Sequence, residues 1–428
     1  MTFYTTIVDL TEKAGSDVLD SDYLAISDEL QTFKLSFGEL KGSIESGLGL
    51  SLYEDNFNST LTPTNFLPIA IGNDSVAIGI SSTSTGTRAL ALGYLSEATG
   101  INSVAIGGGK AGGIISIAIG NNATTTTVST AIGNDSYASG SQSIAIGSTS
   151  RAEGLYSFAG NNSKALSNYS TAIGSNSSGY GSIAETGAGA IALGGSYASG
   201  INSFAAAIGN NTSSYGALAD GSIALGNLAK ASGSNGIALG DNSIASGTYA
   251  IAIGRYAEAN ADYSFSVGRF AKASITGQNT YASGRFSFAG DAQSSLYVLR
   301  MYTTNAVPTV LTTTGGTYVG PDNQIILSNY SAVSFHGTIV AKQRYNQGQD
   351  YAAWEIKGAV SRDNGAASTV LGSYNINTLS KTSGSSSWSI SLEADTTNGG
   401  LAIKVIGSDP VSIRWVASIR TSEVIYNV

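Results

Sequence analysis

Cysteine is absent from this 428-residue chain, histidine occurs once, and only 12% of the residues are charged. Without cysteine the chain has no disulfide scaffold, no thiolate metal site and no thiol nucleophile. A single histidine, His336, cannot build a multi-histidine metal site, and no Gly-x-Ser-x-Gly nucleophile motif accompanies it. The composition therefore predicts a protein without a cofactor or metal that is not an enzyme of the catalytic-triad kind.

The net charge of −8 is unevenly distributed. Residues 1–65 contain 11 acidic and 3 basic residues, whereas 66–290 and 291–428 each contain nine of both. A neutral remainder without a basic stripe argues against nucleic-acid binding. The opening residues, MTFYTTIVDLTEKAG, lack the basic and apolar stretches of a secretory signal, and no apolar run approaches 18 residues. We expect neither a nucleic-acid partner nor membrane insertion.

Within the acidic segment 1–65, apolar residues follow an alternating spacing of four and three between about 19 and 44. This spacing is typical of the contact seam of a coiled coil, and a helix this short needs partner strands. An amphipathic helix packed on the same chain is the alternative. The predicted seam comprises Leu19, Ile26, Leu30, Phe33 and Phe37.

Glycine, with 54 residues, is what the chain has in abundance. Tetrapeptides such as IAIG, VAIG and IALG recur mostly 13 or 14 residues apart over 66–290, with echoes such as YASG and KASG halfway between them. Glycine once per seven residues disfavours a helix. Within a repeat, Ile223 and Leu225 alternate with Ser222, Ala224 and Gly226, which is the period of a strand. We predict a β-solenoid with two short strands per coil, and glycine at left-handed or tightly bent positions.

The two faces of these strands differ in size. A coil of about fourteen residues leaves little room inside, so we expect serine, alanine and glycine to fill it and the aliphatic residues to point outward. An outward aliphatic face of this size must be covered, most simply by identical copies of the chain. The reverse assignment, with aliphatic residues inside, would weaken this argument. The predicted interface residues are Val104, Ile106, Ile117, Ile119, Ile144, Ile146, Ile223, Leu225, Ile237, Leu239, Ile251 and Ile253.

After residue 290 the repeat stops. Residues 291–334 are predicted to be a connector. In 335–428, apolar and polar residues alternate along several segments, which predicts an antiparallel β-sandwich with Trp354, Trp388 and Trp415 in its core. Polar and aromatic residues in two turn clusters are candidates for receptor contact. They are Tyr345, Asn346, Gln347, Gln349, Arg362, Asp363 and Asn364.

The repeated SIAIGxxAxAxG units resemble the head repeats of trimeric autotransporter adhesins, the YadA-like left-handed parallel β-roll, over residues 66–290. The peptides AAWEIKGAVSRDNG and LEADTTNGGLAIKVIG are similar to the C-terminal domain of marine and cyanobacterial phage tail fibres. The first resemblance implies a homotrimer with the aliphatic strands at its axis. Because the signal and membrane anchor of the adhesins are missing from this sequence, the second points to a virion fibre assembled in the cytoplasm of a bacterial host.

The combined expectation is an all-β, homotrimeric, non-enzymatic tail fibre with a short N-terminal coiled coil. Residues 1–65 would bind other tail or baseplate proteins, and the C-terminal sandwich would bind a polysaccharide or protein on the host surface. Three alternatives stay open: a structural head or collar fibre, a cellular adhesin, and a polysaccharide-degrading spike. For the last, the acids in loops of the roll, Glu153, Glu185, Asp220 and Asp262, are the candidates.

Overall fold

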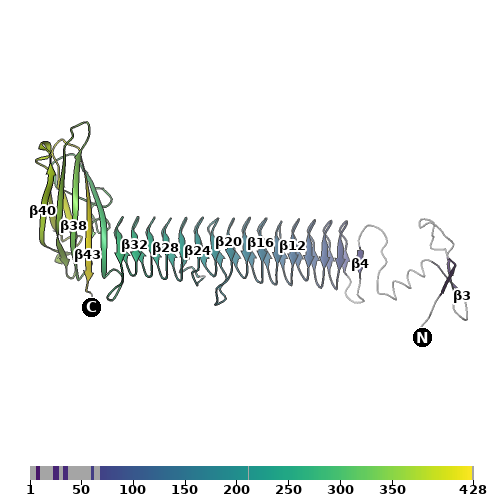
Figure 1. Cartoon of the computed structure of the whole chain (residues 1–428). Coiled ribbons are helices and arrows are strands. Elements are labelled where there is room, and N and C mark those ends of the chain that lie inside the picture. Colours follow the sequence, from purple (N-terminus) through teal and green to yellow (C-terminus); the bar gives the residue numbers. More distant parts are fainter. Residues whose placement is uncertain are drawn as a thin grey trace. The chain divides into compact units, whose positions relative to one another are not determined.

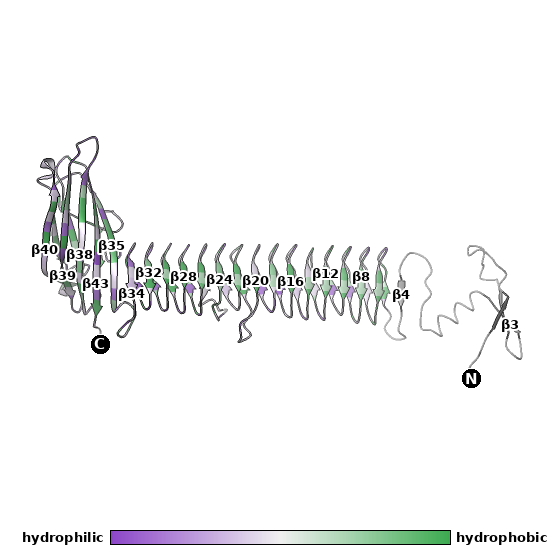
Figure 2. Ribbon diagram, in the orientation of Figure 1, coloured by the Kyte–Doolittle hydropathy of each residue, from purple (hydrophilic) through white to green (hydrophobic). Residues whose placement is uncertain are grey.

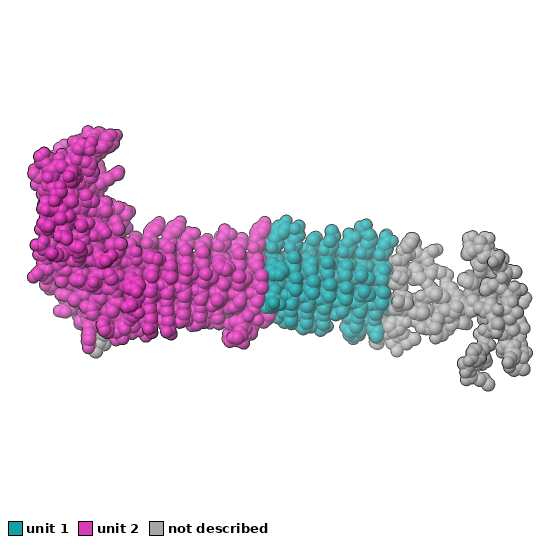
Figure 3. Space-filling view, in the orientation of Figure 1, with its two compact units in different colours: residues 1–161 teal, residues 162–428 magenta. Residues whose placement is uncertain are grey.

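The computed structural model describes residues 6–9, 23–27, 32–36, 59–61, 68–210 and 212–426, the first four ranges by their backbone alone. The chain divides into two compact units, residues 1–161 and 162–428 (Figures 1 and 3). Strands account for nearly all regular structure, with two short 3-10 turns, Ala366–Ser368 and Ser383–Ser385. Within the described ranges, no helix is long and apolar enough to cross a membrane.

The predicted coiled coil falls mostly outside the described residues. Two pieces of it are described, β2 (Tyr23–Ser27) and β3 (Thr32–Ser36), and they pair as antiparallel strands with β1 (Thr6–Asp9). Ile26 pairs with Phe33 between these antiparallel strands instead of lying on a helical seam. Aromatic and β-branched residues favour strands, and a short helix without partners is marginal. A helix is therefore not confirmed here; Leu19, Leu30 and Phe37 lie outside the described residues.

The repeats of the first unit form coils of a parallel β-solenoid, as predicted. Each coil contributes one strand to each of two parallel sheets, and strands of successive coils pair in register, for example Val104 with Ile117. We call the sheet of three-residue strands the apolar sheet and the sheet of two-residue strands the polar sheet. The apolar-sheet strands of this unit are β4 (Ser59–Leu61), β6 (Val76–Ile78), β8 (Leu90–Leu92), β10 (Val104–Ile106), β12 (Ile117–Ile119), β14 (Thr130–Ile132), β16 (Ile144–Ile146) and β18 (Phe158–Gly160). The polar-sheet strands are β5 (Ile69–Ala70), β7 (Thr83–Ser84), β9 (Glu97–Ala98), β11 (Lys110–Ala111), β13 (Thr124–Thr125), β15 (Tyr137–Ala138) and β17 (Arg151–Ala152).

The second unit begins with the same coil. Its longer spacing between Gly174 and Gly194 accommodates an inserted loop closed by the bridge between Ser175 and Gly181. The apolar-sheet strands are β20 (Thr171–Ile173), β22 (Ile191–Leu193), β24 (Phe204–Ala206), β26 (Ile223–Leu225), β28 (Ile237–Leu239), β30 (Ile251–Ile253), β32 (Phe265–Gly268) and β34 (Asn279–Ala282). The polar-sheet strands are β19 (Lys164–Ala165), β21 (Ile183–Ala184), β23 (Tyr197–Ala198), β25 (Gly216–Ala217), β27 (Lys230–Ala231), β29 (Ile244–Ala245), β31 (Glu258–Ala259) and β33 (Lys272–Ala273).

Small residues fill the inside of each coil. Most apolar-sheet strands have a central alanine, such as Ala105 or Ala238, that is fully buried, and so are alanines of the polar sheet such as Ala245. Many interior serines bond their hydroxyls locally: Ser243 Oγ donates to the carbonyl of Gly240, 3.0 Å away. The prediction that small residues face inward and aliphatic residues outward is thus confirmed, and the reverse assignment is wrong.

Glycine ends the apolar-sheet strands with positive φ, as predicted, and residues other than glycine occupy further left-handed positions in the turns. The left-handed position of most turns holds a residue other than glycine, for example Asn242, Tyr249 and Tyr256, with φ between 54° and 56°. Their N–H groups point along the stack: that of Tyr249 donates to the carbonyl of Ser234 at 2.8 Å, which offsets the strain. Glycine instead ends the apolar-sheet strands, where Gly240 has φ +126°, a value that L-residues rarely adopt.

The C-terminal residues form a sandwich of two antiparallel sheets, as predicted. The larger sheet has the order β35 (Ala292–Thr303), β43 (Ile413–Ile425), β38 (Ser331–Gln343), β39 (Tyr351–Arg362) and β40 (Val370–Lys381). β36 (Thr309–Val310), β37 (Ile325–Ile326), β41 (Ser389–Asp395) and β42 (Gly400–Ile406) form the smaller one. The segment 291–334, expected as a connector, thus contributes β35 to the larger sheet.

All three tryptophans lie in the core between these sheets, as predicted. Trp354, Trp388 and Trp415 are each at most 2% exposed, and the Trp354 and Trp415 rings stack with centroids 5.7 Å apart. The larger sheet continues the apolar sheet of the second unit, because β34 pairs antiparallel with β35. The outward side of the last coils and the side of the larger sheet that faces away from the sandwich core are therefore one continuous surface.

Candidate functional site

The strands of the apolar sheet are hydrophobic in both units (green in Figure 2), and their outward side chains are mostly aliphatic. In the first unit Ile117, Ile144 and Ile146 are 38%, 39% and 41% exposed, although isoleucine is usually buried. The predicted interface residues of the roll, from Val104 to Ile253, all point outward on this sheet, and each is partly or largely exposed. In both units the outer side thus consists of rows of solvent-facing aliphatic side chains.

The outer side of the polar sheet is different. Its outward positions are mostly charged, hydroxylated or tyrosine side chains, and opposite charges on neighbouring coils form ladders: Lys110 Nζ lies 3.6 Å from Glu97 and Lys272 Nζ 3.1 Å from Glu258. Exposed pairs like these add little stability and suit a surface in contact with water. The contrast indicates that the outer side of the polar sheet suits contact with water, whereas the outer side of the apolar sheet suits contact with an apolar partner surface.

The acidic residues of the roll loops have structural partners. Asp220 Oδ1 accepts a hydrogen bond from the backbone N–H of Ile201, and Asp262 Oδ1 one from Thr248, both at 2.8 Å between neighbouring coils. The carboxylate of Glu185 accepts a hydrogen bond from the Tyr197 hydroxyl at 2.6 Å, while Glu153 forms an ion pair with Arg151. Burial and Glu185 together raise the pKa of Tyr197 to about 12. These acids act as caps and ion-pair partners of the coil.

The first group of receptor candidates lies in the loop that joins β38 to β39. Tyr345 is 79% exposed there. Gln347, in contrast, holds the loop together: its carbonyl accepts from Gln343 Nε2 at 2.7 Å, and its Oε1 accepts from the N–H of Ser412 at 2.9 Å. Gln349 likewise accepts from Lys342 Nζ, through its carbonyl, at 2.6 Å. Tyr345 and Asn346 are therefore the members of this group most free to meet a ligand.

The second group lies at the other end of the same strand. Arg362 ends β39, and its Nη1 donates to the carbonyl of Leu327 at 2.6 Å, so its side chain is a structural tie. The carbonyl of Asp363 accepts from Tyr330 N–H and Asn364 Oδ1 from Asn329 Nδ2. A 12-residue strand separates the two groups by on the order of 35 Å. They do not form one site.

The side of the larger sheet that faces away from the sandwich core, which we call the open face, carries basic residues that sequence reasoning did not single out. Arg420, His336 and Lys357 lie directly opposite one another on β43, β38 and β39. Arg414 and Lys342 form a second opposed pair on β43 and β38. Arg300 joins them on β35, opposite Val416. All six are exposed in the described structure.

One acid, Glu355, shares this face. Its Oε1 lies 3.0 Å from His336 Nε2. The hydrogen bond from His336 holds the pKa of Glu355 below its usual range, against the smaller effect of burial. The alternation of strand β38 could have placed His336 and Lys342 on one side from the sequence alone, but not their neighbours on β39 and β43.

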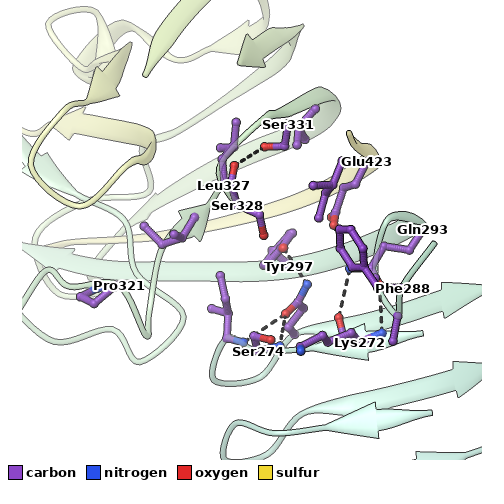
Figure 4. Close-up of a pocket in the computed structure, with 17 residues that line it drawn as sticks. Lys272, Ser274, Phe288, Gln293, Tyr297, Pro321, Leu327, Ser328, Ser331 and Glu423 are labelled. Carbon is purple, nitrogen blue, oxygen red and sulfur yellow. Dashed lines mark hydrogen bonds between the residues drawn. The ribbon is translucent and has the colours of Figure 1, made fainter. Parts of the chain in front are cut away.

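A polar pocket of about 220 Å³ lies where the last coils meet the C-terminal sheets within the second unit (Figure 4). Gln278 crosses it: its amide nitrogen donates to the Tyr297 hydroxyl at 2.8 Å, and its Oε1 accepts from the N–H of Ser274 at 2.8 Å. Gln293 similarly links Lys272 to Glu423. Burial, then Glu423, raises the pKa of Tyr297. The polar groups of the pocket form hydrogen bonds with one another, so the pocket is a structural joint between the last coils and the C-terminal sheets.

Asp291 anchors the same joint. Its carboxylate accepts hydrogen bonds from the N–H groups of Phe286, Ser287 and Phe288 at 2.5–3.0 Å. Burial opposes ionisation, but these three hydrogen bonds and the nearby Arg285 prevail and hold the pKa of Asp291 below its usual value. The ionised form therefore stabilises the fold.

We expect Asp291→Asn to lower the free energy of unfolding by about 2 kcal/mol at pH 7, because charge-assisted hydrogen bonds to buried N–H groups are lost. Since the pKa is depressed in the folded state, this stabilisation is complete above the unfolded value, near 3.9, and is lost as the pH falls through the folded value. Thermal melting at pH 7 and at pH 3 measures this. The difference from the wild type should shrink at pH 3, and Asp363→Asn, at an exposed aspartate, serves as the control; a difference independent of pH would contradict the prediction.

Comparison with known proteins supports the repeat assignment. The YadA head domain repeat matches residues 70–96, 84–109, 129–150, 138–159, 152–177, 217–243 and 245–271. Together these ranges cover about a third of the chain, all of it within the solenoid coils. The chain therefore carries YadA head repeats, as its sequence predicts.

Solved structures offer only distant matches. A tailspike protein of Acinetobacter baumannii bacteriophage Fri1, a capsular polysaccharide depolymerase, aligns at 10% identity over 93% of this chain and 75% of its own, with a TM-score of 0.18. The tailspike protein of Acinetobacter baumannii phage AM24 aligns at 10% identity over 85% of this chain, with a TM-score of 0.17. This chain spans about half, 54%, of the AM24 protein. No curated protein matches the sequence. Superpositions this poor carry no argument about function.

Proposed function

We propose that this protein is a non-enzymatic, homotrimeric adhesive fibre of a bacteriophage virion. The observation that carries the proposal is the aliphatic outer side of the apolar sheet, present on YadA head repeats and absent from the polar sheet. Three copies packed through this side would remove it from water, at roughly 25 cal/mol per Å² of apolar surface. The polar sheets, with their charged ladders, would then face outward on the trimer.

The division of labour follows from the same arrangement. The roll serves as a stiff spacer, because within each unit successive coils are hydrogen-bonded along both sheets. Residues 1–65, which account for the whole net charge of −8, bind the rest of the virion. The C-terminal sandwich contacts the host surface, and three linked sites per fibre raise the avidity of a weak contact.

The intact chain should run at three times its 43.4 kDa mass in native mass spectrometry. We expect the trimer to persist at micromolar concentration, because the buried surface is large and apolar. The purified trimer should also compete with the particle that carries it for adsorption to host cells. A monomeric mass, or a trimer that leaves adsorption unchanged, would contradict the fibre or its adhesive role respectively.

A further inference from the structure

The open face of the larger C-terminal sheet concentrates positive charge. Residues 291–428 contain nine basic and nine acidic residues and are neutral overall. Five of the nine lysines and arginines lie on the open face, but only one of the nine acids, Glu355, does. With His336 counted as neutral, this face carries a net charge of about +4. The charged residues are far apart in the sequence, and strand pairing brings them together.

The charges have a regular geometry. Arg420, His336 and Lys357 form one row across three adjacent strands, which spans about 10 Å at a strand spacing of ~4.8 Å. Arg414 and Lys342 lie six residues further along their strands, about 20 Å away. Between the two rows, Ser418 and Thr338 face each other, and Asn377 lies opposite Glu355. Val340 and Val416, 50% and 42% exposed, also face each other there, so the two cationic rows are separated by hydroxyl, amide and aliphatic side chains.

A second copy of the chain is a poor occupant for this surface. The aliphatic pattern of the apolar sheet ends at Phe265 and Val267, and the next outward residues in register are Asn279 and Tyr281, then Leu296 and Ser294 on β35. The open face follows directly. Packing it against its own copies would bring like charges together, which is unfavourable. Beyond this point the outward side chains are mixed: exposed Val298, Val340 and Val416 lie among the basic residues, so the unbroken aliphatic rows of the roll end where the open face begins.

We propose that the open face binds an anionic polysaccharide, with Arg420, Lys357, Arg414 and Lys342 pairing with its carboxylate or phosphate groups. The intervening serine, threonine and asparagine side chains supply hydrogen bonds for sugar hydroxyls. This deepens the proposed adhesive function by naming the receptor class, and rests on it. A polysaccharide fits better than a nucleic acid, because the centre of the face offers no aromatic ring on which bases could stack; its tyrosines, Tyr302 and Tyr351, lie at one end.

The test measures binding of the full-length chain to polygalacturonate, with neutral dextran as the comparison, by affinity electrophoresis. The wild type should bind polygalacturonate in a salt-sensitive manner and dextran at least tenfold more weakly. The variant Lys357→Gln/Arg414→Gln/Arg420→Gln should bind polygalacturonate at least tenfold more weakly than the wild type. The matched control removes three positive charges from the roll, Arg88→Gln/Lys164→Gln/Lys230→Gln, and should bind within twofold of the wild type.

Three outcomes would overturn the inference: equal binding to dextran, equal losses in both variants, or binding of single-stranded DNA but not of polygalacturonate. Native mass and adsorption competition, measured on the same protein, separate this inference from the proposed function. A trimer that blocks adsorption but does not bind polygalacturonate would contradict this inference and leave the proposed function standing. A monomer that binds polygalacturonate through the open face would contradict the proposed trimeric fibre and leave this inference standing.

Discussion

Gly240→Ala is expected to lower the free energy of unfolding by about 3 kcal/mol, the sum of backbone strain and overpacking. Gly240 ends β28 with φ +126°, where an L-residue is strained. An added Cβ would also lie 2.7 Å from the carbonyl oxygen of Gly254 in the next coil, which cannot move without breaking the stack. Gly254 itself has φ +123° and a Cβ contact of 2.2 Å, so a double Gly240→Ala/Gly254→Ala variant should fail to fold in this region.

Thermal melting followed by circular dichroism measures this effect. The matched control is Gly284→Ala, because an added Cβ there meets nothing within 4 Å and its φ is not in the left-handed range. We expect the control to melt within a degree or two of the wild type, since entropy loss in the unfolded state roughly offsets any cost. Equal melting of Gly240→Ala and Gly284→Ala would show that coil spacing adjusts freely, against the close approach described above.

Ile117→Glu/Ile144→Glu is expected to convert the trimer into a monomer at micromolar concentration. Both side chains are more than a third exposed in the single chain, which tolerates a carboxylate there. In the proposed trimer each substitution would bury three unpaired carboxylates near one another, and an uncompensated buried charge costs about 3–5 kcal/mol. Native mass spectrometry should show the mass fall from three times 43.4 kDa to 43.4 kDa.

The matched control places the same change on the polar sheet. Ile183→Glu/Ile244→Glu alters two outward isoleucines of that sheet and adds the same charge. We expect this variant to remain trimeric, because its glutamates stay in water. If both variants dissociate, or neither does, the apolar sheet is not the surface that joins the copies.

The roll could be predicted from the sequence in nearly all respects because every coil repeats the same short-range pattern of small and aliphatic residues. Alternation separates Ala238 from Ile237 and Leu239, and a coil this narrow accepts only the small residue inside. The turn chemistry was harder to predict. The left-handed positions hold Tyr249 or Asn242, because their N–H groups bond to the coil before, and no pattern within one repeat reveals that bond.

The candidate sites were predictable only in part. Tyr345 and Arg362 both occupy turn sequences, and only the length of β39 shows that they lie at opposite ends of a sheet. Gln347 and Arg362 looked available for a ligand but bind the protein itself. The strand pattern of LYVLRMY is visible in the sequence, but its place in the larger sheet was missed because its partner strand β43 is more than 100 residues away.

The sequence by itself therefore determined the coil, its small interior, its aliphatic outer side and the lack of cysteine and histidine chemistry, because each depends on residues close in the chain. The tertiary structure alone decided where charge accumulates. Residues 291–428 are neutral when counted along the chain, yet antiparallel pairing of β43, β38 and β39 brings Arg420, His336 and Lys357 into one row. Electrostatic fields depend on distance in space, and long-range strand pairing sets that distance.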